Sequence, residues 1–385
     1  QLSKGHAYGL QKIYEMVINT NPCYAYLLNT NPMVDQKIVM AHVFGHADFF
    51  KNNLWFAYTN RNMMDVMANH GTKIRRYMEK YGQDKVELFI DKVLSLENLL
   101  DVNVLYETQE MLNRKNRPAE PQPEHEEDDT SQALKTFMNS KVNPHRKQKE
   151  MTEEDEVKVD LGAAHLPCRD IMKYMMIYAP LKDWESDIVG ILREEAYYFL
   201  PQRLTKIMNE GWASYWHSKI LTQKVLRPGE VVDFADHHAG VMAMSRQRLN
   251  PYKIGIELFR DIEYRWDTGK FGKEYIECNN MTEKNNWDRQ TNLGMQKIFE
   301  VRKCHNDITF IDEFLTPEFC QRQNIFTYKF NNRSGRYEID AREFEEIKSK
   351  LLASLTNFGQ PVIEIESSNY ANRGELLLKH AHQGV

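Results

Sequence analysis

Apolar residues recur at three- and four-residue spacing over most of the first 110 residues, and this periodicity constrains the fold more than any other feature. Such spacing gathers apolar side chains on one face of a helix. The segments concerned are YGLQKIYEMVI (8–18), DQKIVMAHVFGHADFFKNN (35–53), MMDVMANHGTKIRRYMEKYG (63–82) and DKVELFIDKVLSLENLLD (84–101). Similar helical segments follow at 165–222, 230–250 and 252–266. The sequence therefore predicts a mainly helical protein.

The C-terminal residues carry a different pattern. NIFTYKF and RYEID flank NRSG and predict a hairpin, and PVIEIES and GELLLKH predict two more strands joined by NYANR. Between these pairs, AREFEEIKSKLLASLTNF is an amphipathic helix closed by Gly359. The order ββαββ predicts a small α+β domain, so the fold class is α+β, mainly α.

Residues 113–157 separate two helical regions. They are rich in charge and proline and lack periodicity, which predicts an exposed, acidic, mobile insertion. We divide the chain into a helical body (1–112 and 158–250), this insertion, a mixed connecting region (251–324) and a small α+β domain (325–385).

Composition excludes several classes of protein. The 385 residues carry a net charge of −5, which gives no footprint for nucleic acid. We find no apolar run of 18 residues, so no membrane span is expected. Five cysteines without a C-x-x-C pair, and a start that does not resemble a signal peptide, predict reduced thiols and a cytoplasmic location.

His42 and His46 lie four residues apart in the predicted helix at 35–53. Residues at this spacing project from one face, which here also carries Val39 and Phe49. Two imidazoles on one helix are the pair geometry of zinc metallohydrolases. The sequence therefore makes both histidines candidate metal ligands.

Glu210 is the candidate third ligand, because Ala213 and Ser214 at the next turn leave room for an ion and two imidazoles. Two histidines and one glutamate form a catalytic type of zinc site with one open position. His217 lies two turns along the same helix face and is a candidate fourth ligand or proton shuttle. The alternative is a hydrogen-bond network of histidines and a carboxylate without an ion.

A metal-activated water needs a proton acceptor, and Val43 occupies the position after His42 where metallopeptidases have a glutamate. Glu195 lies on the apolar stripe of the predicted helix at 183–199, where burial raises a carboxyl pKa. We therefore take Glu195 as the candidate catalytic base. The alternative is a buried salt bridge between Glu195 and Arg193 or a later arginine.

Six segments together resemble the stage V sporulation protein R (SpoVR) family. They are AHVFGHADFFKNN, REEAYYFLPQ, KIMNEGWASYWHS, ELFRDIEYRWDTGKFG, HNDITFIDEFLTPEFC and NRGELLLKHAHQG. The resemblance implies a cytoplasmic bacterial protein that acts in formation of the spore cortex, a peptidoglycan layer. The motif alone is also similar to zincin-type metallopeptidases, which carries over His42, His46 and Glu210 as ligands and implies a zincin-like helical body.

Two functions remain open at this point. The first is a sporulation protein with a divalent metal, zinc by its ligand set, and hydrolase activity toward a peptidoglycan-related substrate. The second is a noncatalytic regulatory or scaffold protein that binds protein partners through its helical body and C-terminal domain. In the second function the histidines are structural.

Overall fold

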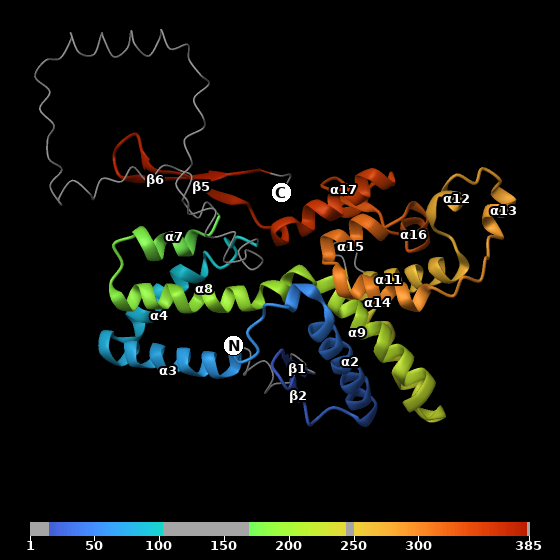
Figure 1. The fold of residues 1–385 in the computed structure, drawn as a ribbon, viewed down its shortest axis with the longest axis horizontal. Helices are drawn as coiled ribbons and strands as arrows, with labels where there is room; N and C mark the ends of the chain where they lie inside the picture. The colour runs from blue at the N-terminus through green and yellow to red at the C-terminus, as the bar shows by residue number, and fades with distance from the viewer. Residues whose placement is uncertain (1–14, 103–168, 244–249, 383–385) are drawn as a thin grey trace, which may run out of the picture.

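The computed structural model describes residues 15–102, 169–243 and 250–382 (Figure 1). These residues are mainly helical and include three separate two-stranded antiparallel sheets. The predicted class, α+β and mainly α, is confirmed at this level. The predicted insertion at 113–157 lies outside the described residues.

The first part of the described chain forms a short hairpin and then a series of helices. Their bounds are β1 (Glu15–Ile18), β2 (Tyr24–Leu27), α2 (Met33–Asn52), α3 (Met63–Tyr81), α4 (Gln83–Leu94), α7 (Ile171–Tyr178), α8 (Asp183–Leu204), α9 (Lys206–Ile220) and α10 (Val231–Val241).

The second part begins with another long helix and ends with two hairpins around a helix. The bounds are α11 (Pro251–Thr268), α12 (Gly272–Ile276), α13 (Met281–Asn285), α14 (Gly294–Cys304), α15 (Asp307–Phe314), α16 (Pro317–Arg322), β3 (Thr327–Asn331), β4 (Arg336–Ala341), α17 (Phe344–Leu355), β5 (Ile363–Tyr370) and β6 (Glu375–His380).

Helix α9 packs extensively against both α2 and α11, and these three helices contribute to the largest apolar core. Phe49 of α2, Trp212 of α9 and Phe259 of α11 are fully buried in it. The region 251–324, expected to be a mixed connection, therefore supplies a central core helix. It also supplies α14 and α15, whose apolar residues complete the same core.

Small residues bring these three helices into backbone contact. A Cβ added to Gly211 of α9 would lie 2.4 Å from Cα of Gly255 on α11. A Cβ added to Gly45 of α2 would lie 2.5 Å from Cα of Ala213, on another face of α9. Since real Cβ atoms do not approach this closely, any larger residue at Gly45, Gly211 or Gly255 would push the helices apart.

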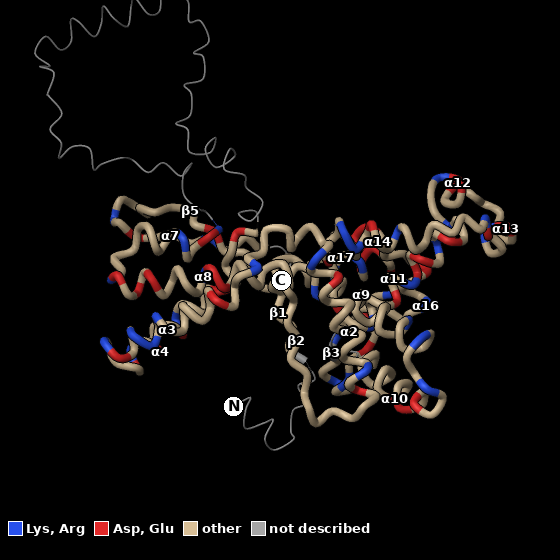
Figure 2. The backbone as a smooth tube through the Cα atoms, turned by 60° about the horizontal axis from the view of Figure 1, so that its bottom comes forward, with Lys and Arg blue, Asp and Glu red and all other residues tan. Residues whose placement is uncertain are grey.

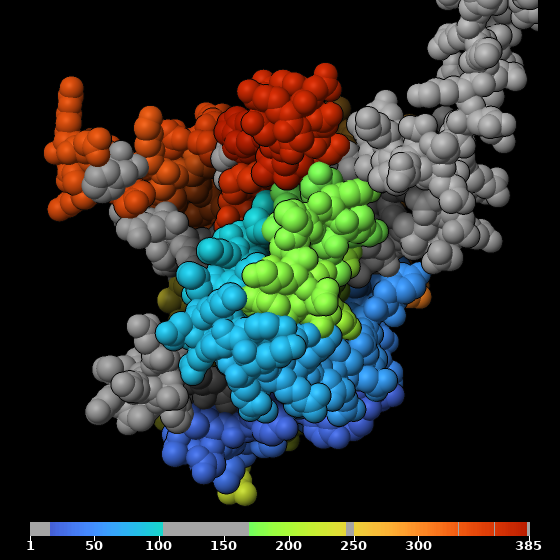
Figure 3. All heavy atoms as spheres, turned by 90° about the vertical axis from the view of Figure 1, so that its left-hand side faces the viewer, coloured from blue at the N-terminus to red at the C-terminus, as the bar shows by residue number. Residues whose placement is uncertain are grey.

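Helices α3, α4, α7 and α8 form a second group, which faces the viewer in Figure 3. Trp184 of α8 stacks on Tyr81 of α3, with ring centroids 5.2 Å apart. Helix α8 then runs from this group toward the three central helices (Figure 1). It contains Pro201 and continues to Leu204, so the proline does not end the helix.

The first predicted helix is wrong where it can be tested. Residues Glu15–Ile18 form a strand that pairs with Tyr24–Leu27, and residues 8–14 lie outside the described part. The β-branched Val17 and Ile18 stand just before a turn containing Pro22, a combination that favours a hairpin over a helix. The short apolar run was therefore misread as helical periodicity.

The predicted C-terminal elements are confirmed, with β3 and β4 before α17 and β5 and β6 after it. The two hairpins form separate sheets. Ile347 of α17 joins the largest core, whereas Ile365 of β5 packs with Ile171 and Tyr174 of α7. The ββαββ segment thus lies against both helical groups.

Charges of both signs are interspersed along the described chain (Figure 2). No helix among the described residues is both long enough and apolar enough to span a lipid bilayer.

Candidate metal centre

His42 and His46 lie one turn apart on α2, and their side chains point into the protein. Each residue is 6% exposed, within a face that also buries Val39, Phe49 and Phe50. The helix predicted from 35 to 53 is confirmed, and the face predicted to carry both imidazoles is its buried face. Burial removes these rings from water, so their nitrogens need partners inside the protein.

Glu210 of α9 meets both imidazoles. Its Oε2 atom lies 3.3 Å from Nε2 of His42 and 3.6 Å from Nε2 of His46. The three ligand atoms all lie within 4.8 Å of one another. Ligands bound tetrahedrally at about 2.1 Å are separated by about 3.4 Å, so the group has the size of a site for a single ion. The structure thus brings together the three predicted ligands.

The small residues around Glu210 act differently from the sequence interpretation. Ala213 does not simply leave space for an ion, because it contacts Gly45 between the two histidines and lets α2 approach α9. Gly211 faces the opposite neighbour, α11. The Glu-Gly-Trp-Ala segment is therefore first a helix-packing motif, and this packing places the carboxylate beside the imidazoles.

The second nitrogen of each imidazole has its own partner. Nδ1 of His46 lies 2.9 Å from Oδ1 of Asn209, and Nδ1 of His42 lies 3.0 Å from Nδ1 of His217. An amide oxygen only accepts hydrogen bonds, so Nδ1 of His46 carries the proton and its Nε2 presents a lone pair toward Glu210. Partners of this kind orient imidazoles that bind metals.

Burial and neighbouring charges set the protonation of the group. Burial, followed by the nearby His42, lowers the pKa of His46 to about 4, so this ring is neutral at pH 7. Burial alone would raise the pKa of Glu210. The imidazoles and the Lys206 ammonium outweigh it and hold that pKa well below its usual range. An ionised carboxylate beside a neutral imidazole is the state that a metal ion requires.

His217 lies behind His42, at the nitrogen that faces away from Glu210. Its Nε2 atom contacts Nδ1 of His238 at 3.2 Å, so three imidazoles follow one another. Burial lowers the pKa of His217 to about 2. All three of these histidines line a second cavity of about 420 Å³, together with Asp35 and Tyr252. This placement suits a residue that orients His42 rather than a fourth ligand.

Glu195, the candidate base, points elsewhere. One of its oxygens lies 3.0 Å from Nδ1 of His70 on α3, and Glu195 does not line the cavity beside the candidate metal centre. The alternative salt bridge to Arg193 is not formed either, because Arg193 pairs with Asp170. Among the described contacts, none joins Glu195 to Glu210 or to the two histidines.

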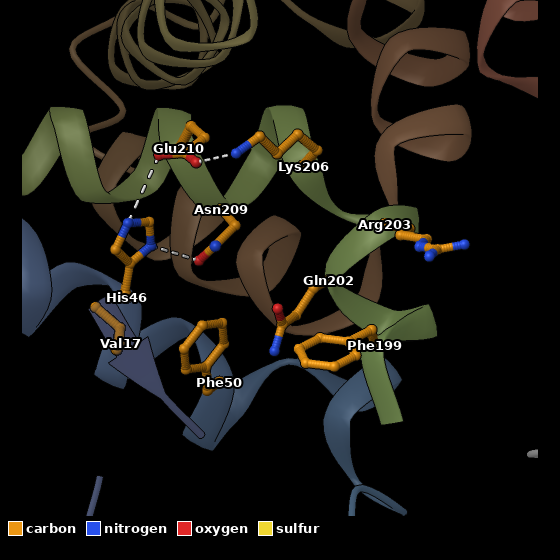
Figure 4. Close-up of a pocket in the computed structure, with 9 residues that line it drawn as sticks. All are labelled: Val17, His46, Phe50, Phe199, Gln202, Arg203, Lys206, Asn209 and Glu210. Carbon is orange, nitrogen blue, oxygen red and sulfur yellow. Dashed lines mark hydrogen bonds and ion pairs between the residues drawn. The ribbon is translucent and has the colours of Figure 1, made fainter. Parts of the chain in front are cut away.

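A cavity of about 600 Å³ opens beside the candidate metal centre (Figure 4). His46 and Glu210 line it together with Lys206 and Asn209 of α9, and Phe50 and Phe199 form apolar walls. Sequence reasoning missed Lys206 and Asn209. Lys206 lies four residues before Glu210, one helical turn away, and Asn209 directly precedes Glu210. These positions could have indicated contacts near the carboxylate, but only once the face of α9 that carries Glu210 was known.

Comparison with known proteins gives the same family as the sequence motifs. The model of the family described as "SpoVR like protein" matches residues 1–360, which contain every residue of the candidate centre. The chain belongs to the SpoVR family. One SpoVR-like relative is an uncharacterized protein, YcgB, of Escherichia coli strain K12, which is 28% identical over 95% of this chain and 72% of its own length. No solved structure matches the chain, and the zincin-like architecture stays a prediction.

Proposed function

We propose that the chain binds one divalent metal ion through His42, His46 and Glu210 and acts as a metal-dependent hydrolase. The observation that carries this proposal is the buried convergence of two Nε2 atoms and one carboxylate oxygen at spacings suited to a single ion. Two imidazoles and one carboxylate form the ligand set of many catalytic zinc sites, which keep one position open. Zinc is therefore the ion that we propose.

A zinc ion in such a site supplies a Lewis acid and lowers the pKa of a bound water molecule. The chain's own residues supply orientation and charge: Asn209 and His217 hold the two imidazole rings, and Lys206 balances Glu210. With Nε2 of His42 as the ligand, its Nδ1 carries the ring proton and donates a hydrogen bond to Nδ1 of His217. We assign no step to Glu195, because it contacts His70 outside the cavity.

Membership of the SpoVR family supports a role associated with sporulation. Within that role, we propose that the protein acts in formation of the spore cortex, on a peptidoglycan-related substrate. The described cysteines Cys23, Cys278, Cys304 and Cys320 are free thiols, which supports a reducing, cytoplasmic location.

Metal analysis of protein purified without a histidine tag tests the proposal. The wild-type protein should contain about one zinc ion per chain, and His46→Ala and Glu210→Ala should lose it. His305→Ala is the matched control, because His305 pairs with Glu313 outside the centre and its loss should leave the metal in place. His46→Ala and Glu210→Ala should also fail to support cortex formation in a spore-forming host, whereas His305→Ala should support it. Full zinc occupancy in His46→Ala contradicts the assignment.

A noncatalytic scaffold is the second candidate function, and two observations favour it. Val43 cannot accept a proton where metallopeptidases have a glutamate. The outer face of α2 also exposes Met33, Met40 and Phe44, and Phe44 is 70% exposed. Exposed apolar residues on one helix face are suited to binding a protein partner. Wild-type protein without metal, together with a fully functional Glu210→Ala variant, would favour this function.

A further inference from the structure

Among the described residues that line the cavity beside the candidate metal centre, cations outnumber carboxylates (Figure 4). Among the described residues that line it, Glu210 is the only carboxylate, whereas Arg203 and Lys206 are cations. Arg203 already pairs with Glu97 and donates to Asn98. Lys206 pairs instead with Glu210, a candidate metal ligand, and is therefore the cation that a bound ion would release to a ligand.

Lys206 contacts only one edge of Glu210. Its Nζ atom lies 2.5 Å from Oε1, whereas Oε2 faces the imidazoles. The Lys206 side chain is 57% exposed, so it reaches both the carboxylate and the open cavity. A divalent ion bound through Oε2 would neutralise Glu210 and weaken its hold on Lys206. The flexible stem would then let the ammonium turn toward an anion in the cavity.

The remaining walls are apolar or neutral. Phe50 lies against His46, with ring centroids 6.0 Å apart and nearly parallel planes, and Phe199 is partly exposed on the far side. Val17 of the β1–β2 hairpin closes another side. Gln202 adds an amide, which carries no charge. A ligand that fills this space therefore needs an apolar group as well as an anionic one.

We propose that this cavity binds an organic anion, a carboxylate or phosphate group attached to an apolar moiety. The anion lies beside Lys206 and the metal centre, and the apolar moiety lies between Phe50 and Phe199. The inference rests on the proposed metal site and narrows its substrate to molecules of this class.

Binding of small probes to zinc-loaded protein tests the inference. We would compare 3-phenylpropionate and 3-phenylpropylphosphonate with the neutral 3-phenylpropionamide by calorimetry. At least one of the two anions should bind about tenfold or more tightly than the amide, because a charge-assisted hydrogen bond to Lys206 is lost in the amide. The preferred anion distinguishes a carboxylate substrate from a phosphate substrate.

Variants of Lys206 separate this role from a structural one. Lys206→Met should lose most of the preference for anions, yet bind zinc more tightly, because Glu210 no longer has a competing cation. Lys206→Arg should retain the preference. Lys224→Met is the matched control, since Lys224 is an exposed lysine beyond the end of α9, and it should change neither property. Phe199→Ala should weaken the binding of the anions and of the amide to the same extent.

The outcomes distinguish the two proposals. If the protein binds zinc but has equal affinity for the amide and both anions, the inference is overturned and the metal function stays intact. The same holds if Lys206→Met has no effect on the preference for anions. A wild-type protein that binds no zinc overturns the metal function. In that case the same probes are compared on the metal-free protein, and equal affinity for the anions and the amide overturns the inference as well.

Discussion

The two helical groups each bury a carboxylate, and the comparison shows how burial serves two different purposes. Asp170, in the α7–α8 group, is 1% exposed and accepts hydrogen bonds from Lys173 N, Arg193 and Tyr197. Its charge is paired with a guanidinium that remains protonated at any ordinary pH. Glu210 is 5% exposed, but it faces two imidazoles and the exposed Lys206 side chain beside a cavity.

The difference is in the partners rather than in the burial. Donors that hold their protons, as around Asp170, satisfy a carboxylate completely and leave nothing for a ligand to bind. Nitrogen lone pairs directed at a carboxylate, as around Glu210, leave a set of donors that an ion completes. The first arrangement stabilises the fold, and the second is suited to function.

Asp170→Asn should give the largest effect and should act on stability alone. It leaves the Arg193 guanidinium, largely buried at 23% side-chain exposure, without its counter-charge. Breaking a buried ion pair in this way typically costs about 3–5 kcal/mol in the free energy of unfolding. Urea denaturation measures that loss, and zinc analysis of the folded fraction should show unchanged metal content. Loss of zinc in this variant would erase the distinction between the two carboxylates.

Glu210→Ala should show the opposite pattern. Removing a ligand should weaken zinc affinity by at least about 100-fold, since loss of an outer partner alone costs 10–100-fold. The unfolding free energy of the metal-free protein should change by only about 1 kcal/mol, because Lys206 is free to return to water. Competition with a chromophoric chelator gives the affinity, and denaturation without metal gives the stability. A large loss of metal-free stability would place Glu210 with Asp170 as a structural group.

His217→Leu should have a smaller effect on the same site. Without an acceptor at Nδ1 of His42, the ring loses its preferred orientation, and zinc affinity should fall by about 10-fold. His217→Gln retains an acceptor and should recover part of the affinity. The visible spectrum of the cobalt-substituted protein, which reports ligand geometry, should change in the leucine variant. An unaltered spectrum would mean that the row of imidazoles does not orient His42.

The pH dependence of the unfolding free energy should show the smallest effect. The pKa of His46 is lowered to about 4 and that of His217 to about 2, mainly by burial, so both rings stay neutral in the folded protein. Unfolded histidines take up protons below about pH 6.5, so acidification from that pH favours the unfolded state. Each ring should contribute at most about 1.4 kcal/mol per pH unit, and the contribution of His46 should end near pH 4.

Denaturation of the metal-free protein at several pH values measures this slope. It should be shallower in His46→Gln, and zinc should reduce the loss of stability near pH 6 because it competes with protons for the same nitrogens. An identical slope in wild type and His46→Gln would show that His46 is not held neutral by the fold.

Much of the site could be predicted because helical spacing is a local property. His42 and His46 had to share a face once their helix was recognised, and the Glu210 segment matched a familiar third ligand. The side-chain partners could not be predicted in the same way. Whether Glu195 turned toward the centre or toward His70 depends on how α3 packs against α8, which no spacing within one helix reveals.

The same limit applies to the fold. The C-terminal ββαββ order followed from turn residues and alternation, whereas the β1–β2 hairpin was missed because its strands have only four residues each. The central position of α11 was also missed. Its closest approach to α9 involves two glycines, and a residue without a side chain leaves no trace in a hydrophobic pattern.

Because Gly45 meets Ala213 while Gly211 meets Gly255, helix α9 is clamped between two neighbours by contacts that no rotamer change can loosen. The backbone contacts between the helices thus fix the positions of the carboxylate and the imidazoles. The walls of the cavity are formed by other side chains, which take no part in these contacts. Exchanges at positions such as Phe199 or Gln202 should therefore change which ligand is bound without disturbing the geometry of the candidate ion-binding atoms.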